Sequence, residues 1–143
     1  MPDVAEQVHI RRFQPADIRQ HDWIVERLIA AFPHQTRFSL PGWLQNIVFA
    51  NEFLFLFQEH AVALAEITSE FSLSGDKVVI ERFVFAEKGH EAEAAQFYTE
   101  FHRWAASHGV KTIIVQEMSD VPHDMIKERL GRIFTRQQQF ARV

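Results

Sequence analysis

The stretch from Val78 to Val115 holds the residue types and the spacing that best support chemistry. It consists of an apolar run (VVIERFVF), a polar turn (AEKGHE), a long amphipathic segment (AEAAQFYTEFHRWAASHG) and a second apolar run (KTIIV). This order predicts a strand, a helix and a parallel strand, and the backbone N–H groups at such a helix start can hold an anion. We therefore expect a candidate anion-binding turn between Lys88 and Glu93.

Metal binding is a second chemistry that the sequence could support. Among 8 histidines, His90 lies three residues before Glu93, and Glu117, Asp120 and His123 follow the second apolar run. Neither group supplies a complete ligand set at the spacing of a known metal site, so we expect no metal cofactor. The sequence motifs of serine hydrolases, P-loop nucleotidases and zinc proteases do not occur.

Composition narrows the classes of function. The 143 residues are 47% hydrophobic, which suits one packed domain spanning 1–143. The formal net charge of −4 is unlike the basic surface that nucleic-acid binding requires. The chain has no cysteine, no signal-like N-terminus and no apolar run near the roughly 18 residues of a membrane span. We predict a soluble cytoplasmic protein without nucleic-acid or membrane partners.

Phenylalanine is unusually abundant, with 14 Phe against 1 Tyr. In EFLFLFQ, phenylalanine and leucine alternate, which predicts a strand buried on both faces. Other aromatic residues lie in or beside connectors: Phe38, Trp43, Phe49 and Phe71. These could form an exposed patch for self-association or a protein partner, or they could line a substrate pocket.

The elements before this unit follow from periodicity. Alternating residues predict a strand over Val8–Phe13, and helical spacing predicts a helix between Asp22, as N-cap, and Pro33. Pro41 at an N1-like position predicts a second helix over 41–50. Apolar runs joined by short turns then predict an antiparallel meander, with strands over 52–58, 61–73 and 78–85.

The elements after the turn change the character of the sheet. A helix from Ala92 is followed by Gly109 as its C′ residue and leads to a strand over 112–116, which is the arrangement of a parallel crossover. The expected buried face of this helix consists of Ala94, Phe97, Phe101, Trp104, Ala105 and His108. A helix over 124–130 and a terminal strand or hairpin from Ile133 complete an α/β domain with a mixed sheet.

This order of elements resembles the GNAT superfamily of acetyl-CoA-dependent N-acetyltransferases. IRRFQPADI resembles the opening strand of the family, EFLFLFQEHAVALAEI its central hairpin, HGVKTIIVQ the entry to its fifth strand, and RLGRIFTRQQQFARV its ending. The resemblance implies a GNAT-like fold with an antiparallel meander and one parallel βαβ crossover. It also implies acetyl-CoA as cofactor and an amine of a small molecule or protein as acceptor.

The family's cofactor motif, R/Q-x-x-G-x-G/A, corresponds to Lys88–Glu93 here. In the family, backbone N–H groups of this turn bind the coenzyme A pyrophosphate, and glycines permit close approach. Glu91 and Glu93 replace the two later glycines, so the motif is degenerate and two carboxylates oppose the phosphates. Glutamates in a first helical turn also stabilise the helix itself, by about 0.3–1 kcal/mol each. The resemblance therefore assigns these positions to the cofactor, with weakened binding: Phe85, Lys88, Gly89, His90, Glu91, Ala92 and Glu93.

Family members use a carboxylate to deprotonate the acceptor amine and a tyrosine on the last helix to protonate the leaving thiolate. The resemblance offers Glu81 in the fourth strand and Glu66 in the third strand as candidate general bases. Both could also be ordinary outward-facing strand residues. The single tyrosine, Tyr98, lies on the crossover helix instead of the last helix, so we expect a structural role for it.

Two hypotheses of function follow. In the first, a GNAT-fold protein has lost acetyl transfer and acts as a protein-binding or structural module, because the cofactor turn and the acid are both altered. In the second, the chain is an N-acetyltransferase with an atypical cofactor turn, and Glu81 or Glu66 is its base. In the family, the pantetheine arm lies in a cleft between splayed fourth and fifth strands. A cleft filled by side chains such as Phe83 or Phe85 would favour the first hypothesis.

Overall fold

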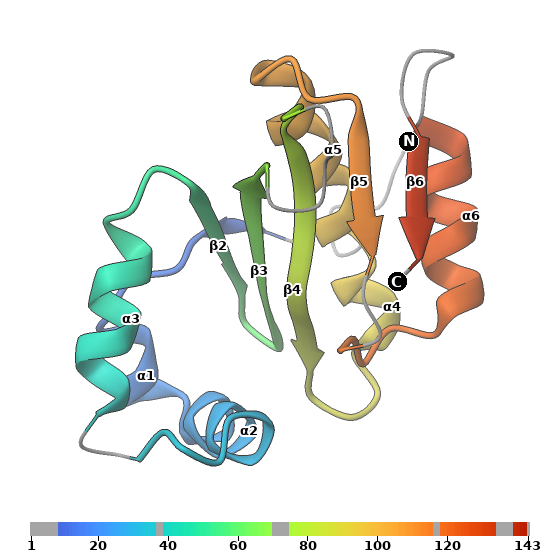
Figure 1. Cartoon of the computed structure of the whole chain (residues 1–143). Helices are drawn as coiled ribbons and strands as arrows, with labels where there is room; N and C mark the ends of the chain where they lie inside the picture. Colours follow the sequence, from blue (N-terminus) through green and yellow to red (C-terminus); the bar gives the residue numbers. More distant parts are fainter. Residues whose placement is uncertain (1–8, 37–38, 70–74, 116–117, 134–138, 143) are drawn as a thin grey trace.

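The structure is a computed structural model, and it describes residues 9–36, 39–69, 75–115, 118–133 and 139–142. Within these residues, one mixed sheet has the strand order β1-β2-β3-β4-β5-β6 (Figure 1). The strands are β1 (Arg11–Arg12), β2 (Phe53–Gln58), β3 (Ala61–Thr68), β4 (Val78–Ala86), β5 (Thr112–Val115) and β6 (Gln139–Arg142). The helices are α1 (Asp17–Gln20), α2 (Asp22–Ala31), α3 (Leu40–Val48), α4 (Glu91–Ala94), α5 (Phe97–Ser107) and α6 (His123–Ile133). No helix in the described residues is long and apolar enough to cross a membrane.

The sheet is antiparallel at one end and parallel at the other. β1 to β4 pair antiparallel with their neighbours, whereas β4 with β5 and β5 with β6 pair parallel. The predicted meander is confirmed, and so is the predicted crossover from β4 to β5. The chain end differs from a hairpin, because α6 makes a second crossover that places β6 parallel to β5.

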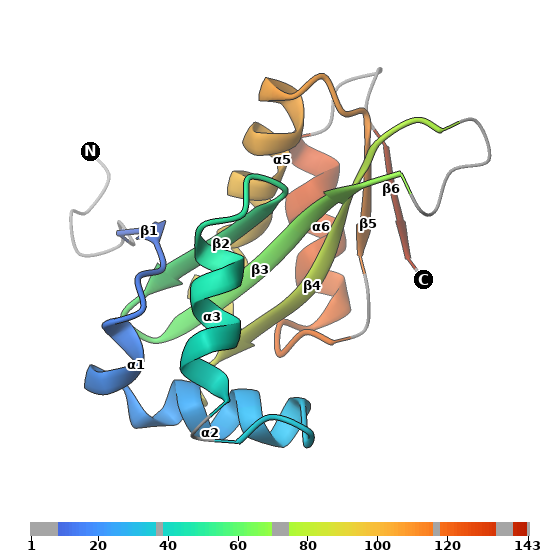
Figure 2. The ribbon, with the colours of Figure 1, turned by 60° about the vertical axis from the view of Figure 1, so that its left-hand side comes forward.

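Helices cover both faces of the sheet (Figure 2). The helices α1, α2 and α3 lie on one face, and α4, α5 and α6 lie on the other. β2 contributes to both cores because alternate side chains of a strand point to opposite faces. Phe55 and Phe57 belong to the core under α2 and α3, whereas Leu54 and Leu56 belong to the core under α5. All four are buried, which confirms the two-sided burial predicted for this strand.

One extra residue in β4 reverses the faces of that strand. Between Leu64 and Ala65 of β3, the paired residue in β4 changes from Phe83 to Glu81, which leaves Arg82 as a β-bulge. Phe83 therefore packs toward α2 and α3, while Glu81 lies on the α5 side of the sheet. The bulge thus decides which β4 side chains reach each layer.

Several boundaries differ from the sequence prediction. The first strand is confined to β1, although the N–H of Phe13 still donates to the Phe55 carbonyl (2.8 Å), and Val8 lies outside the described residues. β3 ends at Thr68, and its predicted continuation over 70–73 also lies outside them. Asp22 is the first residue of α2 and not its N-cap, which is His21.

The predicted crossover helix is divided into α4 and α5 by a turn at 95–96. Tyr98 is fully buried and joins the expected apolar face. His108 is exposed instead of buried, because α5 ends at Ser107 and His108 is already its C-cap. Gly109 follows with φ +68°, which confirms the predicted left-handed C′ residue.

Candidate functional site

The predicted anion-binding turn connects β4 to α4 and contains Lys88–Glu93. Gly89 has φ +92°, a conformation that glycine adopts without steric cost. The N–H of His90 donates to the Glu87 carbonyl (3.0 Å), and the N–H of Glu87 donates to the His60 carbonyl (2.8 Å). The turn is therefore closed by its own backbone and attached to the β2–β3 turn.

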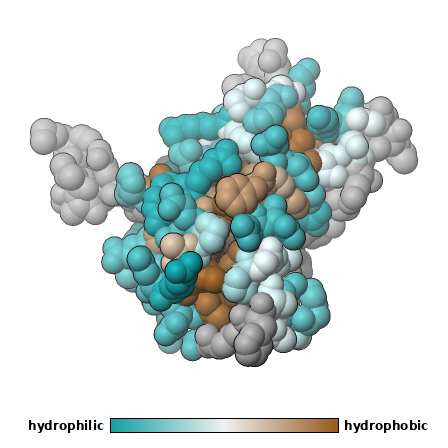
Figure 3. Space-filling model, turned by 90° about the vertical axis from the view of Figure 1, so that its left-hand side faces the viewer, coloured by the Kyte–Doolittle hydropathy of each residue, from teal (hydrophilic) through white to brown (hydrophobic). Residues whose placement is uncertain are grey.

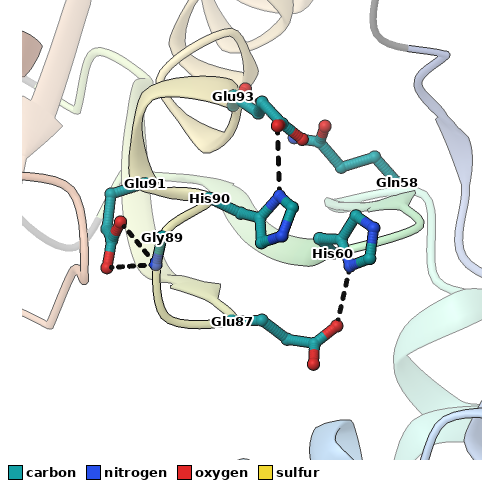
Figure 4. Close-up of polar contacts among 7 residues, drawn as sticks. All are labelled: Gln58, His60, Glu87, Gly89, His90, Glu91 and Glu93. Atoms are coloured by element: carbon teal, nitrogen blue, oxygen red, sulfur yellow. Dashed lines mark hydrogen bonds and ion pairs between the residues drawn. The ribbon is translucent and has the colours of Figure 1, made fainter.

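The side chain of Glu91 engages a backbone donor of this turn. The Gly89 N–H donates to both carboxylate oxygens of Glu91, at N···O distances of 3.0 and 3.2 Å (Figure 4). Glu91 also begins α4, where the helix dipole favours an anion. Backbone N–H groups of such a turn can hold an anion, and here the Gly89 N–H is already bonded to a carboxylate of the chain.

Two stacked histidines join the Lys88–Glu93 turn to the β2–β3 turn. The rings of His60 and His90 lie 3.9 Å apart between centroids at an interplanar angle of 17°. Each Nδ1 contacts a carboxylate, His60 with Glu87 at 2.9 Å and His90 with Glu93 at 3.1 Å (Figure 4). The hydrogen bond to Glu87 raises the pKa of His60. Gln58, which is buried, donates from Nε2 to the Glu93 carbonyl (3.1 Å).

Beyond the bulge, the edge of β4 bonds to the segment after β5. β5 pairs with β4 at Val79 and Ile80, and the next contact is a parallel bridge from Val84 to Ser119. The Val84 N–H donates to the Met118 carbonyl (3.2 Å), and the Val84 carbonyl accepts from the Asp120 N–H (2.8 Å). We call this contact between β4 and residues 118–120 the β4 junction. Beyond the bulge, these backbone groups of β4 are therefore already bonded.

Asp120 extends the β4 junction to α2. Its carboxylate accepts from the Ala86 N–H (3.0 Å) and pairs with the Arg27 guanidinium (2.9 Å). The same guanidinium lies 4.0 Å from the ring centroid of Phe85, within cation–π range. Phe85 is fully buried under this contact, and Phe83 packs beside it with ring centroids 4.6 Å apart.

Glu81, the first candidate base, is fully buried on the α5 side of the sheet. It interacts with Tyr98, whose pKa is raised by burial and by the negative charge of Glu81. The Tyr98 hydroxyl also hydrogen-bonds Ser119 Oγ (2.9 Å), so this buried polar group connects β4, α5 and the β4 junction. A general base must reach the acceptor amine, and a fully buried carboxylate does not present its oxygens to one.

Glu66, the second candidate base, lies in β3 beside the bulge. Its carboxylate forms an ion pair with Arg82, and its side chain is 17% exposed. An acceptor amine would have to compete with this guanidinium for the carboxylate. Glu66 and Glu81 do not form one site, because Glu66 pairs with the bulge residue Arg82 whereas Glu81 faces α5.

The structure brings together residues that local sequence did not connect. Lys88 to Glu93 lie in one turn, as predicted, but their partners Gln58 and His60 were missed. The contacts of Arg27 with Phe85 and of Asp120 with the Ala86 N–H, just before the turn, were missed as well. A sequence signal for His60 existed, since it lies in the turn of the predicted hairpin, yet its neighbour Glu87 is 27 residues away. No group of three metal-ligating side chains occurs among the described residues, and Glu117 lies outside them.

The predicted aromatic patch is only partly present. Phe49 at the end of α3 is 72% exposed, whereas Trp43 is partly buried with its ring 5.6 Å from that of Phe32. Phe38 and Phe71 lie outside the described residues. On this side of the molecule, small apolar areas are separated by polar side chains (Figure 3).

No protein-family model and no curated protein matches this sequence. Solved structures match its fold. AAC(6')-Iy, in complex with the bisubstrate analogue CoA-S-monomethyl-acetylneamine, superposes with a TM-score of 0.65 at 15% identity, over 93% of this chain and 94% of that chain. The aminoglycoside antibiotic 6'-N-acetyltransferase AAC(6')-Ih from Acinetobacter baumannii gives 0.64 at 14% identity over 93% and 94%.

A third match broadens the set beyond aminoglycoside enzymes. Glucosamine-6-phosphate N-acetyltransferase from Arabidopsis thaliana superposes with a TM-score of 0.62 at 13% identity, over 76% of this chain and 81% of that chain. Identities this low establish the fold and not the activity. Together with the meander, the bulge in β4 and the parallel crossover, they show that this chain has the fold of the GNAT N-acetyltransferases.

Proposed function

We propose that this chain is a GNAT-fold binding or structural module that does not transfer acetyl groups. The observation that carries the proposal is the Glu91 carboxylate on the Gly89 N–H. To bind there, a pyrophosphate would have to displace Glu91 and approach its negative charge. One such repulsion at about 4 Å costs roughly 1 kcal/mol in water and about 4 kcal/mol at an effective dielectric of 20.

The β4 junction supports the same proposal at the strands where a pantetheine arm would lie. The N–H and carbonyl groups of Val84 and the N–H of Ala86 are bonded to residues 118–120. A pantetheine arm lying between β4 and β5 would have to replace these bonds. Neither candidate base presents its carboxylate to an acceptor amine, because Glu81 is buried and Glu66 is paired with Arg82.

Calorimetric titration with acetyl-CoA tests the proposal. We expect no saturable binding to the wild-type chain up to about millimolar cofactor, and measurable binding after Glu91→Gly, which removes the carboxylate and restores the family's glycine. Glu26→Gln, an exposed change of the same charge on α2, is the control and should bind no better than the wild type. Micromolar binding to the wild type would overturn the proposal.

An active N-acetyltransferase is the second candidate, and the exposure of the turn favours it. The hydrogen bond from Gly89 to Glu91 lies at the surface, where such bonds contribute only about 0.5–1.5 kcal/mol, so Glu91 could rotate away. Lys88 is exposed beside it and could then pair with phosphate. Release of free thiol from acetyl-CoA with an aminoglycoside or glucosamine 6-phosphate, above the rate without protein, would establish this activity.

A further inference from the structure

Two adjoining hollows lie away from the cofactor turn, between β1, α5 and α6. The first has a volume of about 570 Å³ and includes Gln96, Thr99 and Arg129 in its lining. The second has a volume of about 380 Å³, with Leu54, Leu56 and Trp104 among its lining residues. Both are lined by Ile10, Glu100 and Arg103, so they adjoin along one side of α5. We call them together the α5 groove.

The floor and the rim of the α5 groove differ in chemistry. Leu54, Leu56 and Trp104 line the second hollow and form its apolar floor, although each is at most 9% exposed. Arg129 lines the first hollow and Arg12 lines the second. Neither side chain has a hydrogen bond or ion pair within the described part of the chain. The groove therefore combines an apolar base with uncompensated positive charge, on a chain whose formal net charge is −4.

Two further arginines of the groove differ in availability. Arg103 pairs with Glu100 across one turn of α5 (2.7 Å), but its side chain is 69% exposed. Exposed pairs of this kind contribute at most about 1 kcal/mol, so Arg103 can exchange Glu100 for a ligand anion. Arg11 is not available to a ligand anion, because its guanidinium makes two hydrogen bonds to Asp17 (2.7 and 2.9 Å) and stacks on Phe57.

We propose that the α5 groove binds an organic anion, with an apolar body on Leu54, Leu56 and Trp104 and an acidic group held by Arg103 and Arg129. A carboxylate, sulfonate or phosphate group fits these arginines, because a guanidinium binds such groups through paired, charge-assisted hydrogen bonds. The site goes beyond the proposed function, since it gives the module a ligand class. It shares no residue with the cofactor turn, so the two can fail separately.

The probe for this proposal is 8-anilinonaphthalene-1-sulfonate, an aromatic body with one sulfonate, and its fluorescence reports binding to the full chain. We expect saturable binding that the double substitution Arg103→Gln and Arg129→Gln weakens at least about tenfold, as loss of charge-assisted bonds implies. Lys127→Gln, an exposed change of charge on α6 outside the groove, should leave the affinity unchanged. Phe49→Ser controls for binding of the probe to the exposed ring on α3.

Each outcome decides the matter. Equal weakening by the double substitution and by Lys127→Gln would indicate general electrostatics and overturn the proposal, as would loss of binding in Phe49→Ser alone or absence of saturable binding. N-phenyl-1-naphthylamine, the neutral analogue, should bind at least about tenfold more weakly than the sulfonate, and equal binding would remove the anion requirement. Amide shifts at Leu54, Thr99 and Arg129 should locate the probe, and Glu91→Gly should not alter its affinity.

Discussion

The β4 junction and the α5 groove, which adjoin the same sheet, differ in whether their polar groups already have partners within the protein. In the junction, the carboxylate of Asp120 serves both Arg27 and a backbone N–H of β4. In the groove, the side chains of Arg12 and Arg129 have no hydrogen bond or ion pair within the described residues. A ligand at the junction must displace internal partners before it gains its own contacts, whereas a ligand in the groove adds partners to free cations. The two regions therefore differ in the cost of binding, because backbone groups of β4 are already bonded whereas two arginine side chains of the groove are not.

The largest expected effect comes from removing Asp120. Asp120→Ala leaves the Arg27 guanidinium and the Ala86 N–H without their acceptor, so the free energy of unfolding should fall by about 2–3 kcal/mol in urea denaturation. The matched substitution in the groove is Arg129→Gln, which should change stability by no more than about 0.5 kcal/mol. Equal losses for the two would remove the energetic contrast between junction and groove.

The Tyr98 hydroxyl is expected to contribute less. Tyr98→Phe removes the hydrogen bond to Ser119 and the contact with Glu81, and we expect a loss of about 1–2 kcal/mol in thermal or urea unfolding. The neighbouring Thr99→Val is the control, because Thr99 Oγ1 is buried without a hydrogen-bond partner in the described residues. That change should be neutral or stabilising, and a Tyr98→Phe variant as stable as the wild type would contradict a structural role for the phenol.

The histidine pair predicts a smaller, pH-dependent effect at the cofactor turn. The pKa of His60 is raised in the folded state by Glu87, so its stabilising contribution is fully present below the unfolded pKa, near 6.5, and is lost as pH rises through the folded pKa. The negative charges of Glu59 and Glu93 also raise the pKa of His60. The side chain is 37% exposed, so solvent screens much of the effect.

Urea unfolding of wild type and His60→Gln at pH 5.5 and pH 8 measures this contribution. The wild type should be the more stable of the two at pH 5.5, and the difference should shrink at pH 8. His34→Gln, at an exposed histidine beside α2, is the matched control for loss of a histidine side chain. A difference that grows with pH would have the wrong sign for a histidine paired with a glutamate.

The smallest expected effect is that of Arg103→Gln on stability. Its pair with Glu100 is exposed, and such i, i+3 pairs contribute about 0.2–0.5 kcal/mol, less at high salt. A loss above about 1 kcal/mol would mean that Arg103 is part of the structure and is not free to bind a ligand. This measurement therefore sharpens the role of the groove independently of any probe.

Local patterns predicted most of the fold. The alternation of Phe and Leu in β2 and the position of Gly109 depend on side-chain period and backbone φ, which neighbouring residues decide. The burial expected for His108 was wrong, because this residue is the C-cap of α5 and is exposed. The bulge at Arg82 was not located, because it is defined only by the register of β4 against β3.

The candidate site divides in the same way. The turn from Lys88 to Glu93 is contiguous, so its position could be predicted, and its glutamates were read as anionic competitors of phosphate. The burial of Glu81 and the pairing of Glu66 could not be predicted, since both depend on which face of the sheet each strand residue occupies. The junction at Asp120 joins residues 34 apart in the chain and has no local signal.

The order of the elements, the two-sided burial of β2 and the position of Glu91 and Glu93 in the turn after β4 follow from the amino-acid sequence. The tertiary structure alone decided that the Glu91 carboxylate lies on the Gly89 N–H, that residues 118–120 bond to β4, and that free arginines gather over an apolar floor beside α5. The difference arises from the distance along the chain over which each interaction acts. Periodicity and φ preferences act between neighbours, whereas a donor's partner and a charge's burial depend on segments that meet only when the chain is folded.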